Sequence, residues 1–231
     1  MSQDLPVIDV IIPAFNEEDS IGLVLDEIPS FVRKVVVVNN NSTDHTSLRA
    51  KEGGAVVLDE PRRGYGTACL TGIAYLSTLE VQPQIVVFLD GDYSDYPEET
   101  GNIIRPIVEG KADMVIGSRA RGIREPGSMT FPQVFGNFLA TNLMRWIYGV
   151  NYSDLGPFRA IRWESLLSLD MMDKDYGWTV EMQVKAAKQQ LRHVEVPVNY
   201  KKRIGKSKVS GTIKGTVMAG YKILWTLFRF S

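Results

Sequence analysis

The chain has 231 residues, 44% of them hydrophobic and 23% charged, which is the composition of an ordinary soluble globular protein. A formal net charge of −1 provides no overall positive field, so we do not expect a general nucleic-acid binder. A single cysteine excludes an internal disulfide and a zinc site made of several cysteines, and two histidines far apart in sequence argue against a histidine-rich metal centre.

The length suits one large domain with a substantial core. The N-terminus carries an acidic residue and lacks the apolar stretch of a signal peptide. Every apolar run is too short or too charged to cross a bilayer as a helix. We therefore expect a cytoplasmic protein, with contact at a membrane surface left open.

The first half of the chain alternates strand-like and helix-like segments. Apolar, β-branched runs predict strands at 7–12, 34–38, 55–58, 85–89 and 113–116. Between them, helices are predicted at 19–28, 43–52, 67–79 and 97–109. This alternation is typical of βαβ units, so we predict an α/β fold with a Rossmann-like, mostly parallel sheet flanked by helices.

The second half does not show this regular alternation of strands and helices. A loop is predicted over 118–130, helices over 131–148 and 176–190, and a late strand over 193–200, whose proline at 197 indicates a sheet edge. Residues 201–211 are basic and contain glycine. We expect residues 1–211 to form one domain.

A C-terminal amphipathic helix is predicted for residues 212–231. On a helical wheel its apolar stripe consists of Ile213, Val217, Tyr221, Leu224 and Phe228, and the cations beside the stripe are Lys214, Lys222 and Arg229. A basic, aromatic-edged helix can lie on a membrane surface. Packing on the core, or on a second subunit of a homo-oligomer, explains the same pattern.

Two acids, Asp90 and Asp92, follow the apolar strand 85–89 and are separated by Gly91. Strands of a parallel sheet are covered on both faces, and ligands bind outside their carboxyl ends. Carboxylates at that edge suit Mg²⁺ or Mn²⁺, whose shell a substrate's phosphates complete. An ordinary Asp-Gly turn accounts equally well for the three residues alone.

Polar segments follow the first two strands as well. Residues 13–18 are P-A-F-N-E-E and residues 39–44 are N-N-N-S-T-D. Their side chains could contact a nucleotide at the same sheet edge, or could form turns and helix caps. Residues 61–68, around Gly64, could bring backbone N–H groups and arginines to a phosphate. That segment matches neither the Walker A motif nor G-x-G-x-x-G.

Three later motifs carry charged residues. Residues 117–119 are G-S-R, with further arginines at 121 and 124, and residues 154–159 are D-L-G-P-F-R. Arginines near a phosphate-binding edge suit an anionic acceptor, although a solvated surface explains them too. In residues 176–181, Y-G-W-T-V-E, the tryptophan is expected in the core. Glu181 is placed to pair with Lys185 on an exposed helix face.

Taken together and in order, from about residue 7 to residue 211, the motifs resemble those of the inverting family 2 glycosyltransferases of GT-A fold. Within that family the chain is most similar to the dolichol-phosphate mannosyltransferase and polyprenyl-phosphate glycosyltransferase branch. The motifs that carry this resemblance are P-A-F-N-E-E, N-N-N-S-T-D, R-G-Y-G-T-A, L-D-G-D, G-S-R, D-L-G-P-F-R, Y-G-W-T-V-E-M-Q and V-P-V-N-Y-x-x-R-x-G-x-S-K.

The resemblance implies a UDP- or GDP-linked sugar donor, a divalent cation at Asp90 and Asp92, and a lipid-phosphate acceptor. The donor site would be formed by Pro13, Ala14, Phe15, Glu17, Asn39, Asn40, Gly64, Asp90, Gly91 and Lys208. Asp92 and Arg203 would act on the leaving diphosphate, and Arg119 would position the acceptor phosphate. An acceptor phosphate needs no strong base, whereas a hydroxyl acceptor would need one, for which Asp154 and Glu181 are candidates.

The chain departs from the family pattern at several positions. Asn39-Asn40-Asn41-Ser42 replaces D-D-G-S, Tyr65 replaces a lysine, and Gly156-Pro157 replaces Ser-Gly. The first departure leaves the choice of nucleotide open. Two alternatives therefore stand beside transfer to a polyprenyl phosphate. One is transfer to a saccharide or small-molecule hydroxyl, and the other is a nucleotide-sugar-binding protein without turnover.

Overall fold

The computed structural model describes residues 5–205 and 213–229. A seven-stranded sheet in the order β3-β2-β1-β4-β6-β5-β7 forms its centre. The strands are β1 (Ile8–Ala14), β2 (Lys34–Asn39), β3 (Val56–Asp59), β4 (Ile85–Phe88), β5 (Met114–Ser118), β6 (Arg159–Arg162) and β7 (His193–Pro197). Only β6 runs antiparallel to its neighbours, β4 and β5. The predicted mostly parallel sheet is thereby confirmed, as is the edge position of β7.

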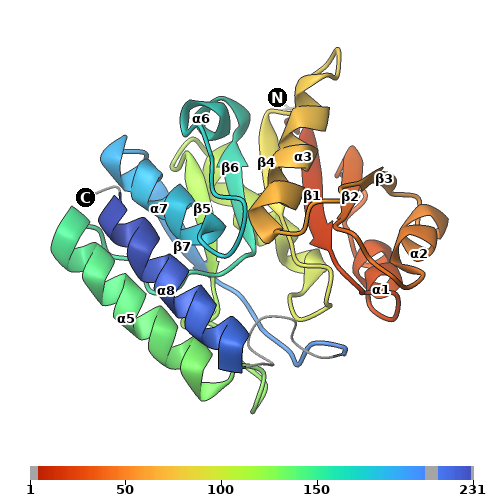
Figure 1. Cartoon of the computed structure of the whole chain (residues 1–231). Helices are drawn as coiled ribbons and strands as arrows, with labels where there is room; N and C mark the ends of the chain where they lie inside the picture. The colour runs from red at the N-terminus through yellow and green to blue at the C-terminus, as the bar shows by residue number, and fades with distance from the viewer. Residues whose placement is uncertain (1–4, 206–212, 230–231) are drawn as a thin grey trace.

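Helices cover both faces of the sheet (Figure 1). They are α1 (Ile21–Asp26), α2 (Thr46–Glu52), α3 (Tyr65–Ser77), α4 (Thr100–Val108), α5 (Phe131–Tyr148), α6 (Trp163–Ser168), α7 (Trp178–Lys188) and α8 (Ile213–Arg229), with a short 3-10 helix η1 (Pro97–Glu99) before α4. Side chains of each strand alternate between two apolar clusters, one on each face. One cluster packs against α1, α2 and α4, and the other against α3 and α5 to α8.

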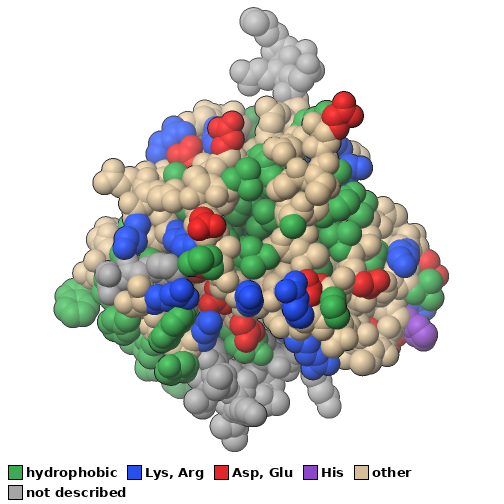
Figure 2. Space-filling view, turned by 45° about the horizontal axis from the view of Figure 1, so that its top comes forward, with side chains coloured by type: hydrophobic (Ala, Val, Ile, Leu, Met, Phe, Trp, Pro, Cys, Tyr) green, Lys and Arg blue, Asp and Glu red, His purple; other side chains and the backbone are tan. Residues whose placement is uncertain are grey.

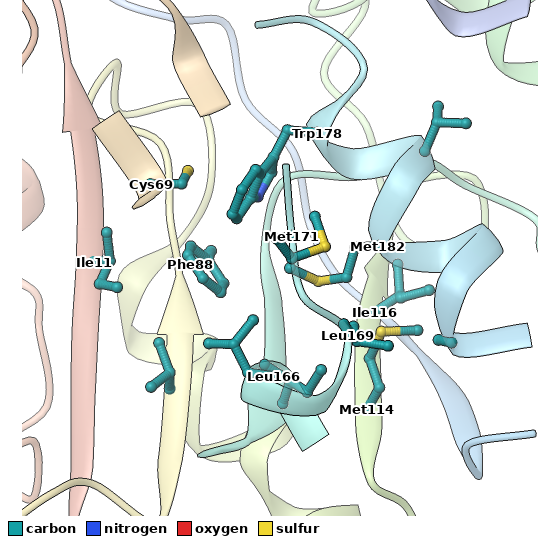
Figure 3. Packing of buried hydrophobic residues seen from close by; sticks show 14 of the residues in the cluster. Ile11, Cys69, Phe88, Met114, Ile116, Leu166, Leu169, Met171, Trp178 and Met182 are labelled. Carbon is teal, nitrogen blue, oxygen red and sulfur yellow. The ribbon is translucent and has the colours of Figure 1, made fainter. Parts of the chain in front are cut away.

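The second cluster contains the buried aromatic residues that support the site. Trp178 at the start of α7 is 1% exposed and meets Phe88 of β4 edge-to-face, with ring centroids 5.9 Å apart. Cys69 of α3 is fully buried nearby, as Figure 3 shows. Trp178 was predicted to belong to the core, and this prediction is confirmed.

Helix α5 begins and ends where the sequence predicts. Thr130 and Gln133 form a capping box, Pro132 lies in the first turn, and Gly149 ends the helix in the left-handed conformation at φ 69°. Helix α8 packs beside α5, and the Tyr148 hydroxyl of α5 donates a hydrogen bond to the Leu227 carbonyl of α8. Among the described residues, no helix combines the length and apolarity needed to cross a bilayer.

Strand β6 and helix α6 were not predicted. The strand is only R-A-I-R, with an arginine at each end, so it lacks the apolar run that marks β1, β2 and β4. Its place between β4 and β5 comes from tertiary pairing, in which Ala160 lies opposite Val87 on one side and Val115 on the other.

Candidate active site

The carboxyl ends of β1, β2 and β4 meet at one edge of the sheet. The register places Ala14 at the end of β1 beside Asn39 at the end of β2, and β4 continues through Leu89 into Asp90. A cavity of about 560 Å³ opens at this edge, and we call it the active-site cavity. The predicted residues that line it are Pro13, Ala14, Phe15, Glu17, Asn40, Gly64, Asp90, Gly91, Asp92, Arg119 and Arg203.

Asp92 is buried and is held by several contacts. Its Oδ1 accepts hydrogen bonds from the backbone N–H and the hydroxyl of Ser94, at 2.9 and 2.5 Å. Its Oδ2 forms an ion pair with Arg203, and its backbone carbonyl accepts the N–H of Ile204 at 3.0 Å. The segment after β7 is thereby fastened to the acid pair, which brings Arg203 into the cavity.

Asp90 is the second acid of the pair. Its Oδ1 accepts a hydrogen bond from the Tyr65 hydroxyl at 3.0 Å. Burial and then the charge of Asp92 raise the pKa of Asp90 well above its ordinary value, against the opposing effects of Arg203 and Tyr65. Burial also raises the pKa of Tyr65, so its hydroxyl stays protonated and donates. In the protein alone, the ionised form of Asp90 is therefore disfavoured beside Asp92.

The side of Gly91 on which a side chain would stand is directed at β1, not at the cavity where a ligand was expected. A Cβ placed there would lie 3.4 Å from Ile12 and 3.5 Å from Ala14, both on β1. The Gly91 carbonyl accepts the Ser20 hydroxyl at 2.8 Å. The missing side chain thus faces β1, whereas we had expected it to leave room for a ligand.

Arg119 lines the cavity from the end of β5 and is held by Asp154. Its Nε and Nη2 donate to the two carboxylate oxygens of Asp154 at 2.9 and 2.7 Å, and its guanidinium lies over the ring of Tyr200, 5.1 Å from the centroid. Burial raises the pKa of Asp154, but Arg119 lowers it more, and the net shift is downward. Asp154 lies outside the residues that line the cavity, so it positions Arg119 and is poorly suited to act as a base.

Glu181 is also absent from the cavity lining. Its buried carboxylate accepts the backbone N–H groups of Met172 and Asp173, at 3.0 and 2.6 Å, and pairs with Lys185 at 2.8 Å. The predicted pairing within α7 is confirmed, but Glu181 is buried, whereas an exposed face was expected. The carboxylate is engaged in holding the preceding loop, which argues against the candidate role as a general base. Lys208, predicted near the diphosphate, lies outside the described residues.

The loops after β1 and β2 are joined by hydrogen bonds. The N–H of Asn16 donates to the Ser42 hydroxyl at 3.0 Å, and the N–H of Glu17 donates to the Thr46 hydroxyl at 2.8 Å. In return, Asn16 Oδ1 accepts the N–H of Thr43 at 2.8 Å. These bonds hold the cavity-lining residues of the first loop against the second strand.

The two asparagines predicted at the nucleotide site make structural contacts. Asn39 donates through Nδ2 to Asp59 at 2.8 Å, and it does not line the cavity. Asn40 does line it, but its Oδ1 accepts the N–H of Gly64 and its Nδ2 donates to the Arg62 carbonyl, both at 2.8 Å. Asn40 therefore fastens the β3–α3 loop to the end of β2.

Gly64 is required by its surroundings. Its φ is +143°, and a Cβ there would lie 2.0 Å from the Lys174 carbonyl oxygen. The same carbonyl accepts the N–H of Thr67 at 3.0 Å. The start of α3 is thus docked on residues 173–174, and the N–H groups of Gly64 and Thr67, which we had expected to face a phosphate, bond within the protein.

Three contacts in and beside the cavity were not predicted from the sequence. Tyr65 contacts Asp90, as described above, and Arg63 stacks on Phe15 with 4.2 Å between the guanidinium carbon and the ring centroid. Buried Arg159 donates to the carbonyls of Leu155, Gly156 and Thr179, each at 3.1 Å, and so joins the loop before β6 to α7. Burial lowers the pKa of Arg159 to about 10. In the sequence, the buried position of Arg159 could have been recognised only from an arginine that lies within a short apolar stretch.

The far side of the cavity is largely apolar. Its lining residues come from the loop before α5, from α5 and α8 themselves, and from residues 155–179. The apolar residues and glycines among them are Met129, Pro132, Gly136, Leu155, Pro157, Tyr176, Trp178, Gly220 and Ile223, and the polar ones are Gln133, Asn137, Asp175 and Thr179. The sequence predicts helices α5 and α8 but contains no signal that both would border the cavity. One cavity therefore joins a charged wall to an apolar one.

The acid pair supplies oxygen ligands of the kind that Mg²⁺ and Mn²⁺ use. Within residues 5–205 and 213–229, no group of three or more His, Cys, Asp and Glu side chains is placed to hold a metal ion. Asp92 is moreover shared with Arg203. The residues present therefore fit a divalent cation that arrives with a phosphate-bearing substrate and shares its ligands.

Comparison with known proteins extends this description. Residues 9–169 match the model of the family described as glycosyl transferase family 2. An uncharacterized glycosyltransferase of Mycobacterium tuberculosis is 36% identical over 92% of this chain and 94% of its own length. The undecaprenyl-phosphate mannosyltransferase of Micrococcus luteus is 32% identical over 89% of this chain and 88% of that protein.

A solved structure has the same fold. Glucosyl-3-phosphoglycerate synthase from Mycobacterium tuberculosis, crystallised with Mn²⁺, UDP-glucose and phosphoglyceric acid, gives a TM-score of 0.77 at 23% identity. The alignment covers 97% of this chain and 79% of that one.

Proposed function

Because the chain belongs to glycosyl transferase family 2 and has the GT-A fold, we propose that it transfers a hexose from a nucleotide-diphosphate sugar to a polyprenyl phosphate. The observation that carries this proposal is the single cavity with one charged and one apolar wall. The charged wall suits a sugar diphosphate, and the apolar wall suits the first isoprene units of a lipid acceptor.

On the donor side, Asp90 and Asp92 would hold Mg²⁺ or Mn²⁺ together with the diphosphate. When bound, the cation stabilises the negative charge of the leaving nucleoside diphosphate. Arg203, paired with Asp92, adds a second positive charge at the same place. Tyr65 keeps Asp90 oriented through its hydrogen bond. UDP- and GDP-linked donors are both compatible with this arrangement.

On the acceptor side, Arg119 would bind the phosphate. Asp154 uses its Nε and Nη2, and the remaining N–H donors are available to a ligand in the cavity. A phosphate oxygen attacks the anomeric carbon, the bond from that carbon to the diphosphate oxygen breaks, and the configuration is inverted. The attacking oxygen is already anionic, so no base has to remove a proton.

A hydroxyl acceptor is the second candidate, and the positions of the acids argue against it. It would need a base within hydrogen-bonding reach. Asp154 is engaged with Arg119, and Glu181 is engaged with backbone N–H groups outside the cavity. Neither of the two acids considered for that role is placed to accept the proton.

The experiment that tests the proposal compares two acceptors that differ only in the phosphate. Purified full-length protein is incubated with Mn²⁺ and radiolabelled UDP- or GDP-hexose, together with polyprenyl phosphate or the corresponding polyprenol in detergent. We expect labelled glycosyl-phosphoryl-polyprenol, of inverted anomeric configuration, from the phosphate alone. Transfer to the polyprenol or to a saccharide, with none to the phosphate, would overturn the proposal.

A further inference from the structure

The exposed aromatic side chains of this protein are concentrated on two helices. Among the described residues, every aromatic side chain in the set of exposed large hydrophobic residues lies on α5 or α8. We call this set the aromatic face, and it consists of Phe131, Phe135, Phe138 and Trp146 on α5 and Tyr221, Trp225 and Phe228 on α8. Trp146 is 81% exposed, and Phe131 is 80% exposed. Such a concentration marks an interaction surface.

The two helices pack against each other and so hold these side chains in a fixed arrangement. They run side by side in the same direction (Figure 1), and the Tyr148–Leu227 hydrogen bond joins their carboxyl ends. Behind the face, Ala140, Met144 and Leu227 are buried in the core. Successive exposed residues are spaced by three, four or eight positions, so each helix turns one stripe outward. Figure 2 shows hydrophobic side chains gathered at the lower left, the side on which α5 and α8 lie in Figure 1.

The charges on these helices are all positive. Neither α5 nor α8 contains an Asp or a Glu, whereas Arg145, Lys222 and Arg229 are present on them. Lys222 and Arg229 lie over the ring of Trp225, 5.0 and 4.8 Å from its centroid, and Lys222 also pairs with Asp173 at 3.0 Å. A face of aromatic and cationic side chains without carboxylates is complementary to an anionic surface.

A hollow of about 700 Å³ borders the same face. Val134 and Phe138 of α5 line it together with Arg121, Arg124 and Arg145, and the two acids that also line it, Asp154 and Glu195, are paired with Arg119 and Arg121. Arg121 lies 3.9 Å from Glu195, while Arg124 and Arg145 are exposed. Apolar side chains next to arginines suit the headgroup phosphate of a lipid and the start of its acyl chains.

A second copy of this chain fits the face less well. Two copies meeting through it would bring the cations of α5 and α8 together, with no carboxylate on either helix to pair with them. The apolar wall of the active-site cavity, in contrast, is formed by Pro132 and Gly136 of α5 and Gly220 and Ile223 of α8. The face and the apolar wall therefore share their two helices.

We propose that the aromatic face docks on the surface of a bilayer that contains anionic lipids, with α5 and α8 lying in the interfacial region. Tryptophan, tyrosine and phenylalanine side chains then enter the headgroup boundary, and the arginines contact lipid phosphates. The evidence for docking is the set of exposed aromatic and cationic side chains on α5 and α8, and it does not depend on the proposed function. Delivery of a lipid-linked phosphate from the bilayer into the cavity rests on the proposed function.

The first test uses the four tryptophans of the chain. Trp146 and Trp225 belong to the aromatic face, whereas Trp163 and Trp178 are 4% and 1% exposed. The full chain is mixed with phosphatidylcholine vesicles that contain or lack phosphatidylglycerol. We expect flotation with the anionic vesicles, a blue shift of tryptophan emission and quenching by brominated lipid. Absence of binding to anionic vesicles would overturn the proposal, as would a blue shift from self-association that needs no vesicles.

The second test replaces two side chains of the face that lie outside the cavity lining. The double variant Trp146→Ser/Phe228→Ser is expected to lower partitioning onto anionic vesicles at least ~10-fold, since each side chain contributes apolar area to the interface. The matched control, Leu48→Ser/Leu167→Ser, removes side chains that are 51% and 47% exposed on α2 and α6. An equal loss in the control would overturn the proposal.

A third measurement separates docking from the proposed function. The same variants are assayed with polyprenyl phosphate embedded in vesicles and with a short-chain, water-soluble polyprenyl phosphate. We expect the double variant to lose transfer to the embedded acceptor alone. Transfer to neither acceptor by the unmodified chain, with vesicle binding intact, would remove the proposed function and leave docking standing. Equal transfer by the double variant to both acceptors would overturn the docking proposal.

Discussion

The two walls of the active-site cavity are built in different ways. The wall at the ends of β1, β2 and β4 is held by hydrogen bonds, since Asp92 contacts Ser94 and Arg203, and Asp90 accepts from Tyr65. The wall formed by α5 and α8 consists mainly of apolar side chains and glycines, such as Ile223 and Gly136, with the amides of Gln133 and Asn137 among them.

The difference suits the proposed function, in which one cavity holds two unlike substrates. Directional bonds fix polar groups where charge develops, and such preorganisation is the main source of transition-state stabilisation. Burial of apolar surface is non-directional and tolerates chains of different length. We therefore expect changes on the charged wall to affect chemistry strongly, and changes on the apolar wall to affect acceptor binding moderately.

The largest effect is expected for Asp92→Ala, which removes one acid of the pair and the partner of Arg203. The rate of transfer should fall at least ~10³-fold, because preorganised charge at a reacting centre is worth about that much. Single-turnover measurements with labelled donor give the rate directly. Asp26→Ala, at an exposed position on α1, is the control and should retain the full rate. Metal-dependent turnover of Asp92→Ala within about tenfold of the unmodified chain would refute the role of Asp92.

A smaller loss is expected for Tyr65→Phe, which removes only the hydroxyl that binds Asp90. The affinity for a nucleoside diphosphate with Mn²⁺ should fall about 10-fold, since a hydrogen bond to a charged group contributes about 1.5–3 kcal/mol. Isothermal titration calorimetry measures the change without any acceptor. Tyr75→Phe, on the same helix, makes the same chemical change away from the cavity. If both variants bound equally well, Tyr65 would have no part in placing Asp90.

On the apolar wall, Ile223→Ala should raise the KM for polyprenyl phosphate about fivefold, because part of the removed apolar area contacts the acceptor. The affinity for the nucleoside diphosphate should be nearly unchanged. Steady-state kinetics with varied acceptor and direct titration of the nucleotide separate these quantities. A matching loss in both would mean that the two walls are not independent.

The smallest effect is expected for Glu60→Gln, in the loop that supports Gly64. Hydrogen bonds from the Arg62 side chain, against the effect of burial, lower the pKa of Glu60 from 4.5 to about 2. Its carboxylate therefore stabilises the folded chain above the pKa of an unfolded glutamate, and the stabilisation is lost as the pH falls through about 2.

Urea unfolding at several pH values tests this prediction. Glu60→Gln should lower the free energy of unfolding by about 1 kcal/mol at neutral pH, because Arg62 is exposed and the pair is partly screened. The deficit should shrink as the pH falls from 4.5 toward 2. A deficit that stays constant over this range would show that the charge of Glu60 does not matter.

The charged wall could be predicted from the sequence because its residues follow recognisable strands. The run before Asp90 has the continuous apolar character of a strand covered on both faces, and ligands bind where such strands end. The bounds of α5 were likewise predictable, since Thr130, Pro132 and Gly149 mark its two ends. In both places local chemistry and the final fold agree.

Other features could not be predicted because they depend on contacts between residues that are far apart in the sequence. The Tyr65–Asp90 bond joins two loops, and the clash that requires Gly64 comes from a carbonyl at residue 174. Glu181 is an acid of the kind that can act in catalysis. Its carboxylate instead accepts the backbone N–H groups of residues 172 and 173, outside the cavity. Strand β6 has two arginines in four residues and takes its place only by pairing with β4 and β5.

The position of β6 has a consequence for how the chain folds. Strand β4 carries the acid pair at its end, but its second neighbour is β6, which lies more than half the chain length from the N-terminus. Until residues 159–162 have been synthesised, β4 and β5 each have an unpaired edge open to solvent and to other chains. The first half of the chain therefore leaves β4 unpaired on one side. A ribosome-bound nascent chain completes the contacts of the acid pair only after β6 has inserted and Arg203 and Ile204 have been added.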